Sequence, residues 1–284
     1  MGVLPVEGWM LVLGDTVYAV KGCEHPLPCF HAVGKRRGRI KLDPFEPLEP
    51  LRWSRCLLGK FTVICPWDDP IALDPIASLE SLIDAGWRDP IVEELYSVVG
   101  GSLGVTGSLL YGHLFGLTHR DIDLVVYGES ASKRALNVIL DLWAKGLTEP
   151  VGGEEYGVVR REVEVEEWLL LASRNPLFFR YGGRRYTVRL VACKSPVACE
   201  EPLSRQPIRA SVFIEEPVTP CLTPSVYRGR LADGGRVQVY TLRSSLACMP
   251  RGSRLDGVFT LEVHRGYTRL VPDGGVVGIQ VLQG

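Results

Sequence analysis

The chain has no apolar run that approaches the roughly 20 residues needed to span a membrane as a helix. It also has almost no net charge, since 32 basic and 33 acidic residues leave −1, so no overall field attracts it to nucleic acid. Any contact with a polyanion must come from a local patch. The first residues lack the basic start of a signal peptide. These absences lead us to expect a cytoplasmic protein of ordinary globular composition.

Lysine, amide side chains and methionine are all scarce. The chain has seven lysines, six asparagines and glutamines together, and three methionines, and arginine carries most of the positive charge. Few heat-labile side chains suit life at high temperature, although a GC-rich genome also favours arginine over lysine. We expect a thermophilic source.

The eight cysteines are too sparse for a secreted scaffold held together by disulfides. Disulfides inside a cell are an open alternative if the source is hyperthermophilic. Cysteine and histidine alternate between Cys23 and His31, but the spacing fits no common zinc motif and two prolines interrupt it. We favour buried thiols and a turn there. The cysteines are Cys23, Cys29, Cys56, Cys65, Cys193, Cys199, Cys221 and Cys248.

Three regions differ in pattern, and together they predict an α/β (α+β) protein. Residues 1–75 form an α/β or β-rich region, with two strands over 9–20 that turn at Gly14-Asp15 and another strand over 59–65. Residues 76–200 alternate helices and strands, and residues 201–284 alternate short apolar strands with turns. We expect the last region to be a small β-barrel of the OB type, whose arginines could face RNA.

The central region contains most of the expected elements. Asp89-Pro90 is a helix start, and Ser78 and Ser130 are candidate caps. The pattern predicts helices over 79–85, 90–99, 109–115, from 130 onwards and over 154–173, and strands over 121–127 and 185–193.

One segment has residues that suit phosphate and metal binding. Gly107-Ser108 stands where a strand ends and a helix begins, and there backbone N–H groups and the serine hydroxyl can meet a phosphate. Asp121 and Asp123 follow on a strand, and a period of two puts both carboxylates on one face. Paired carboxylates that repel each other suit Mg²⁺ or Mn²⁺ held together with nucleotide phosphates.

Gly-Ser, a short helix and then Asp-x-Asp on an apolar strand resemble the signature of the DNA polymerase β-type nucleotidyltransferase superfamily. The runs Gly104-Val105-Thr106-Gly107-Ser108, Asp121 to Gly128 and Val20 to Pro26 resemble, more narrowly, a group of archaeal proteins within it. The resemblance implies a mixed sheet of the nucleotidyltransferase fold. It also implies that Gly107 and Ser108 bind the triphosphate of the nucleotide, and that Asp121 and Asp123 coordinate the catalytic metal ion.

The chain departs from the superfamily pattern at one position. Active members usually carry a third carboxylate on the next strand, but residues 185–191 contain no acid, and Arg189 stands about where that acid is expected. Glu164, Glu166 and Glu167 are expected on a helix, as a solvated face. We therefore expect a Mg²⁺-dependent enzyme that transfers a nucleoside monophosphate from an NTP to a hydroxyl acceptor, with RNA as a candidate. The alternative is a catalytically inactive protein of the same fold that binds RNA or nucleotide.

Two further signals are weaker. Basic and aromatic residues alternate between Arg174 and Arg185, which could grip a nucleic-acid strand or form the rim of a hairpin. His113 and His119 flank the Gly-Ser helix, where either could touch a nucleotide, although a polar helix end explains them as well.

Overall fold

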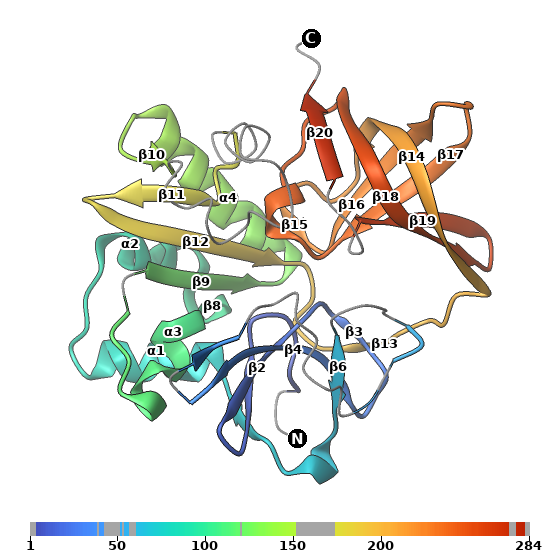
Figure 1. Cartoon of the computed structure of the whole chain (residues 1–284). Coiled ribbons are helices and arrows are strands. Elements are labelled where there is room, and N and C mark those ends of the chain that lie inside the picture. The colour runs from blue at the N-terminus through green and yellow to red at the C-terminus, as the bar shows by residue number, and fades with distance from the viewer. Residues whose placement is uncertain are drawn as a thin grey trace. The chain divides into compact units, whose positions relative to one another are not determined.

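The computed structural model describes residues 4–38, 40–42, 52, 54–56, 61–119, 121–151, 174–272 and 277–281. Helices and strands are mixed, and strands predominate. The chain divides into two compact units: Met1–Thr148 with Arg180–Cys199, and Glu149–Phe179 with Glu200–Gly284 (Figure 1). No described helix has the length and apolarity needed to cross a membrane.

The first unit begins with a six-stranded antiparallel sheet. Its path is β5-β4-β2-β1-β7, and β6 pairs with β4. The predicted pair of strands with a turn at Gly14-Asp15 is confirmed as β1 and β2. Only the later part of the strand expected over 59–65 is described, as β6. The bounds are β1 Met10–Leu13, β2 Thr16–Val20, β4 Phe30–Arg37, β5 Ile40–Lys41, β6 Thr62–Ile64 and β7 Ile71–Leu73.

The same unit contains a second sheet in which β9 (Asp121–Tyr127) is central. It pairs in parallel with β12 (Arg184–Val191) and antiparallel with β8 (Leu103–Thr106). The hairpin partner of β12 is β11 (Phe178–Tyr181). The strand predicted over 121–127 is confirmed as β9. The strand predicted over 185–193 is confirmed as β12, which begins one residue earlier and ends two residues earlier than predicted.

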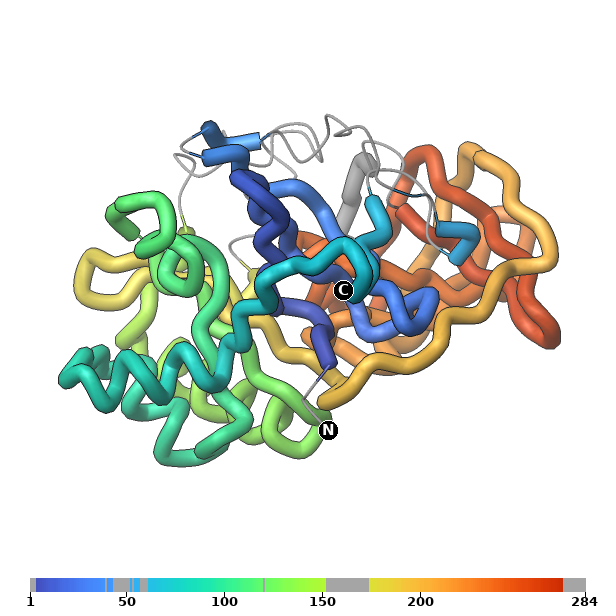
Figure 2. The backbone as a smooth tube through the Cα atoms, turned by 90° about the horizontal axis from the view of Figure 1, so that it is seen from below, coloured from blue at the N-terminus to red at the C-terminus, as the bar shows by residue number. Residues whose placement is uncertain are grey.

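Helices cover one face of this central sheet. Alternate residues of β9, such as Ile122 and Leu124, are buried, and the helix α4 (Glu129–Ala144) packs on β9 and β12 and against α2 (Pro90–Val99). The opposite face is apolar at one end, where Val125 and Tyr127 pack against the N-terminal sheet. The path of the chain through this unit can be followed in Figure 2. The remaining elements are α1 Pro75–Asp84, α3 Gly107–Tyr111, β3 Glu24–His25, β13 Val197–Ala198 and the 3₁₀ turns η1 Pro66–Asp68, η2 Gly100–Ser102 and η3 Gly112–Phe115.

Two of the helices start at an Asp-Pro pair. Asp89 caps α2, as predicted, by accepting hydrogen bonds from the first amides of the helix. The start expected at Ser78 is wrong, because α1 begins at Pro75 and Asp74 caps it in the same way. A proline at the first helical position has no N–H to satisfy, so an acidic cap before it makes a strong start.

The second unit contains a closed five-stranded barrel. The strands run β14-β16-β17-β19-β18, and β18 pairs again with β14 from Ser204 to Phe213, which closes the ring. The pairing of β17 with β19 is parallel, and the other pairings are antiparallel. β20 adds to the outside of β18. The prediction of a small barrel is confirmed, and the described residues after 200 contain no α-helix. The bounds are β14 Ser204–Pro217, β16 Ser225–Leu231, β17 Arg236–Thr241, β18 Ser253–His264, β19 Tyr267–Val271, β20 Val277–Val281, β10 Glu149–Pro150, β15 Leu222–Thr223 and η5 Ser244–Leu246.

All eight cysteines form disulfides, so the expectation of buried thiols between Cys23 and His31 is wrong. The first unit contains Cys23–Cys193, Cys29–Cys65 and Cys56–Cys199, and the second contains Cys221–Cys248. Cys23 and Cys29 are therefore not zinc ligands. The pairings join residues far apart in the chain, and no local spacing rule could have found them.

Some expected features lie outside the described residues. They are the helix over 154–173, which includes Glu164, Glu166 and Glu167, and the proline-rich connection that we expect from Pro44 to Pro50.

Candidate functional site

Asp121 and Asp123 lie on one face of β9, as their spacing predicted. Asp121 is opposite Arg185 of β12 in the parallel register, and the two side chains form an ion pair. Both remain partly accessible, with 32% of the Asp121 side chain and 27% of the Arg185 side chain exposed. The first carboxylate of the predicted metal pair is thus already neutralised by a guanidinium of the protein.

Asp123 has a more enclosed environment. It is opposite Thr187 in the register, whose hydroxyl donates to it, and Arg189, Lys35 and Lys21 are near enough to act on its charge. Burial raises the pKa of Asp123, and these basic groups and the hydrogen bond offset only part of that effect. The carboxylate therefore depends on its basic neighbours to stay ionised.

Gly107 stands beside Asp123, directly after the end of β8, and Ser108 follows it in the chain. Thr106 is opposite Asp123 in the antiparallel register, so the next residue, Gly107, meets the Asp123 side chain. A Cβ atom at Gly107 would collide with that carboxylate, and its backbone has a φ of +62°. Only glycine fits both conditions. Ser108 is half-buried, and its hydroxyl forms no side-chain hydrogen bond within the described part of the chain.

A third carboxylate in the same unit, Glu7, is not among the site residues predicted from the sequence. Its side chain is fully buried and accepts from Lys21 Nζ at 2.8 Å, Arg189 Nη1 at 3.1 Å and Gly22 N at 2.7 Å. Burial alone would raise the pKa of Glu7, but Lys21 and Arg189 outweigh it and hold the pKa below its usual value. An acid in the apolar stretch from Val3 to Met10 was the signal that could have found it.

The N-terminal sheet contributes further basic groups. A bulge in β4 falls at Lys35, between two residues that pair with consecutive positions of β2. The next residue, Arg36, hydrogen-bonds the hydroxyl of Tyr111, whose pKa is raised by burial. We call the following residues the charge cluster: Glu7, Asp121, Asp123, Lys21, Lys35, Arg36, Arg185 and Arg189. The charge cluster thus contains five basic groups and three carboxylates.

The basic neighbours of these carboxylates do not suit a resident divalent metal ion. Mg²⁺ needs carboxylate oxygens that are free to coordinate it, whereas each of the three carboxylates here has basic partners. Two like unit charges about 4 Å apart repel by about 4 kcal/mol at an effective dielectric constant near 20. No group of three acidic, histidine or cysteine side chains suited to a metal occurs in the described part of the chain. The metal-ligand role of Asp121 and Asp123 stays a prediction that the charges disfavour.

The weaker candidates are exposed or already have structural partners. His113 and His119 are both exposed. In the hairpin of β11 and β12, Phe179 is buried and Arg184 pairs with Asp89, so the hairpin does not present an uninterrupted row of rings and cations. On the barrel, Arg228, Arg230 and Arg254 pair with Glu216, Glu215 and Asp256.

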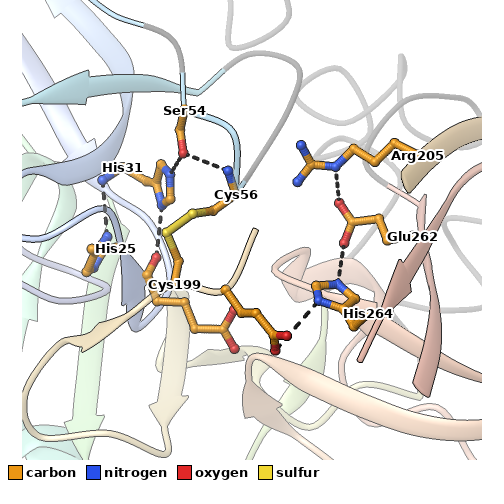
Figure 3. The surroundings of a disulfide bond; sticks show 10 residues. His25, His31, Ser54, Cys56, Cys199, Arg205, Glu262 and His264 are labelled. Atoms are coloured by element: carbon orange, nitrogen blue, oxygen red, sulfur yellow. Dashed lines mark hydrogen bonds and ion pairs between the residues drawn. A yellow bond between two sulfur atoms is a disulfide. The ribbon is translucent and has the colours of Figure 1, made fainter. Parts of the chain in front are cut away.

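Two buried polar networks lie outside the charge cluster. In the first unit, His31 Nε2 lies 2.6 Å from Ser54 Oγ, close to the disulfide Cys56–Cys199 (Figure 3). Burial and the neighbouring His31 lower the pKa of His25 to about 3, so His25 is neutral at ordinary pH. The other network belongs to the barrel.

In the barrel network, Glu262 accepts from Arg205 at 2.7 Å, and His264 is 3.4 Å away (Figure 3). Glu262 also accepts from Arg269 at 2.5 Å. Burial would raise the pKa of Glu262, but the two arginines outweigh it and lower the pKa. The carboxylate is thus held ionised in a buried position. Both networks have the character of structural polar cores.

Comparison with protein-family models, with curated proteins and with solved structures produced no match.

Proposed function

We propose that the protein is a nucleotidyltransferase-like protein that binds the phosphates of a nucleotide or RNA at the charge cluster and does not transfer them. The order of elements supports the likeness. A strand ends in Gly107-Ser108, a short helix follows, and the Asp121–Tyr127 strand returns beside it. The helix α4 follows that strand, and β12, which comes later in the chain, pairs with the strand in parallel.

The basic neighbours of Glu7, Asp121 and Asp123 are the observation that carries this proposal. Basic side chains attract a phosphate group, whereas they repel a divalent cation. Arg185 and Arg189 are suited to this role, because a guanidinium presents several N–H donors in a fork that matches phosphate oxygens. The Ser108 hydroxyl can donate to the same anion.

The proposed loss of transfer follows from the state of the carboxylates. Activation of an acceptor hydroxyl needs a carboxylate free to accept its proton. Glu7 is fully buried and accepts from Lys21 and Arg189, and Asp121 is ion-paired with Arg185. Neither is both accessible and free to act as a base, and Asp123 is enclosed and accepts from the Thr187 hydroxyl.

The test is incubation with each labelled NTP, Mg²⁺ or Mn²⁺ and total RNA, with label transfer followed alongside NTP binding. We expect NTP binding without label transfer. Transfer that disappears in an Asp121→Ala, Asp123→Ala double variant would establish the rival function, a Mg²⁺-dependent transferase. If the protein neither transfers label nor binds NTP at millimolar concentration, both functions are rejected.

A further inference from the structure

We infer that the outer face of the barrel binds single-stranded RNA across the strands β18, β14, β16 and β17. This surface shares no residue with the charge cluster, and its partner goes beyond the proposed function. The register of the four strands brings an aromatic ring and three guanidinium groups into one row. We call it the arginine row, and its members are Arg254, Phe213, Arg230 and Arg236.

The arginine row crosses four neighbouring strands. Phe213 of β14 is opposite Arg254 of β18 on one side and Arg230 of β16 on the other. Arg230 is in turn opposite Arg236 of β17. Neighbouring strands lie about 4.8 Å apart, so the row extends for roughly 14 Å along the sheet. That is the length of about four nucleotides stacked at about 3.4 Å each.

The row faces away from the barrel core. Side chains alternate between the two faces of a strand, and the chain neighbours of the row residues pack in the core. These neighbours are Val212, Ile214, Leu231, Val237 and Leu255. Arg230 and Arg236 are exposed, and Arg254 and Phe213 are half-buried. An RNA strand can therefore reach the row from solvent and needs no cavity.

The charges of this face suit a polyanion. Arg236 is exposed and makes no ion pair with any residue in the described part of the chain. The same is true of Arg209, which lies on the same outer face of β14 as Phe213 because the two are four residues apart. Both guanidinium groups are thus open to phosphate oxygens, which their fork of N–H donors matches.

The other arginines of the row pair with acids at the surface. Arg230 pairs with Glu215, and Arg254 pairs with Asp256, with about a third or more of each side chain exposed. Ion pairs as exposed as these contribute little to stability, so a phosphate can take the place of a carboxylate at low cost.

Phe213 and Arg254 form a platform for an unpaired base. The Arg254 guanidinium carbon lies 5.6 Å from the centroid of the Phe213 ring. Asp256 and Ser211 accept hydrogen bonds from Arg254, which hold the guanidinium there before a ligand arrives. Unpaired bases stack on aromatic rings and on guanidinium planes, whereas the bases of a duplex are already stacked on one another. The platform therefore favours a single strand.

The acids of this face favour RNA over DNA. Glu215, Glu216 and Asp256 present partly exposed carboxylate oxygens beside the arginines. A ribose 2′-hydroxyl can donate to such an oxygen, whereas deoxyribose has no hydroxyl at that position. Guanidinium groups interleaved with acceptors thus fit a ribose-phosphate backbone.

The experiment is fluorescence anisotropy of the full chain with a labelled oligouridylate of about 12 nucleotides, at several salt concentrations. We expect the logarithm of the affinity to fall against the logarithm of salt concentration with a slope of about −2, as three phosphate contacts on a single strand require. Arg236→Gln should weaken binding about fivefold and make the slope shallower by about 0.7. Phe213→Leu should weaken binding about fivefold or more and leave the slope unchanged, because it removes stacking and no charge.

Two controls accompany these variants. Arg265 is exposed on the turn between β18 and β19, at the other end of β18 from Arg254, so Arg265→Gln removes the same charge outside the row. It should change neither affinity nor slope. The deoxythymidylate oligonucleotide of the same length should bind about fivefold more weakly, as the loss of one hydrogen bond implies.

Four outcomes would overturn the inference, with melting temperature used to confirm that each variant is folded. Equal weakening by Arg265→Gln and Arg236→Gln would show only a general attraction of charges. RNA binding that neither Arg236→Gln nor Phe213→Leu changes, and that millimolar ATP displaces, would place RNA at the charge cluster and leave the proposed function standing. Equal affinity for the deoxy oligonucleotide would reject RNA as the specific partner. A protein that binds ATP but no oligouridylate would reject this inference alone.

Discussion

Gly107 is the residue at which backbone geometry and the candidate site meet. Its φ of +62° already disfavours a side chain, and a Cβ atom there would lie 2.9 Å from Asp123 Cγ and 3.1 Å from Asp123 Cβ. We predict that Gly107→Ala lowers the free energy of unfolding by about 1 kcal/mol because of the backbone conformation. The collision with Asp123 should lower it by about 1–3 kcal/mol more. Urea denaturation measures the sum.

Gly146 is the matched control for this substitution. Its φ is +67°, but a Cβ atom there would have no neighbour within 4 Å. Gly146→Ala should therefore cost only the backbone part, about 1 kcal/mol. Equal losses in the two variants would show that Asp123 does not pack against Gly107.

Glu7 and Asp123 have pKa shifts of opposite direction, so their neutral variants should differ in sign. The lowered pKa of Glu7 means that its ionised form stabilises the native state above pH about 4.5, and that this contribution is lost as pH falls through the lowered pKa. The raised pKa of Asp123 means that its ionisation destabilises the native state once pH rises above its usual 3.8 and through the raised value.

At pH 7 we predict that Glu7→Gln costs about 3 kcal/mol, because two cations lose their buried carboxylate. Asp123→Asn should leave stability unchanged or higher. Thermal unfolding followed from pH 3 to pH 8 measures both effects, and the stability of Glu7→Gln should vary less than that of the wild type between pH 3 and 5. Loss of stability in both variants at pH 7 would contradict the assigned shifts.

The sequence predicted part of the charge cluster, for a physical reason. A period of two placed Asp121 and Asp123 on one face, because that depends only on the strand itself. The pairing of Asp121 with Arg185 depends on the register between two strands separated by a helix. The contact between Glu7 and Arg189 depends on how two sheets pack, which no local pattern encodes.

At the scale of elements, the aspartates of the two Asp-Pro helix starts differ in the number of hydrogen bonds that they accept. Asp74 caps α1 only, whereas the buried Asp89 caps α2 and also accepts from Tyr186 Oη at 2.8 Å and Arg184 Nη1 at 3.2 Å. We predict that Asp74→Ala costs about 1 kcal/mol. Asp89→Ala should cost about 2–4 kcal/mol, since Tyr186 also loses its hydrogen-bond acceptor.

Chemical denaturation of these two variants tests the difference. The contrast depends on burial, because water can replace a lost cap at an exposed helix end but not at Asp89, which is 1% exposed. Similar costs for the two substitutions would mean that Asp89 does not join α2 to β12.

The barrel shows which elements local patterns can predict. The β17 segment alternates apolar and polar residues, a pattern that predicts a strand, and the later part of β18 has the same pattern. The long strand β14 is not predicted in this way, because Pro207 and several polar residues hide its alternation. It is nevertheless the strand that closes the ring, through pairing with both β16 and β18.

At the scale of the whole molecule, the disulfides set the conditions for stability. We predict that the purified protein has no thiol that reacts with an alkylating reagent before reduction, and eight after reduction and unfolding, by intact mass. Reduction should lower the melting temperature, because closing a loop of about 100 residues restricts the unfolded chain by about 4–5 kcal/mol in the loop-entropy model. Reactive thiols in the native protein would reject the pairings.

Variants can separate the two units. Removing Cys23–Cys193, which spans 170 positions, should destabilise the first unit more than removing Cys221–Cys248, which spans 27, destabilises the barrel. The disulfides also link two expectations from the sequence, a cytoplasmic location and a thermophilic source. Stable disulfides inside a cell are characteristic of hyperthermophiles.

The long-range disulfides also constrain the order of events during synthesis. Cys29 can meet Cys65 early, but Cys23 and Cys56 must wait until residues 193 and 199 have been made. By then β12, with Arg185 and Arg189, has left the ribosome as well. The last covalent closures of the first unit therefore come only after every member of the charge cluster has been translated, so a chain truncated before β12 has neither Arg185 and Arg189 nor these two crosslinks.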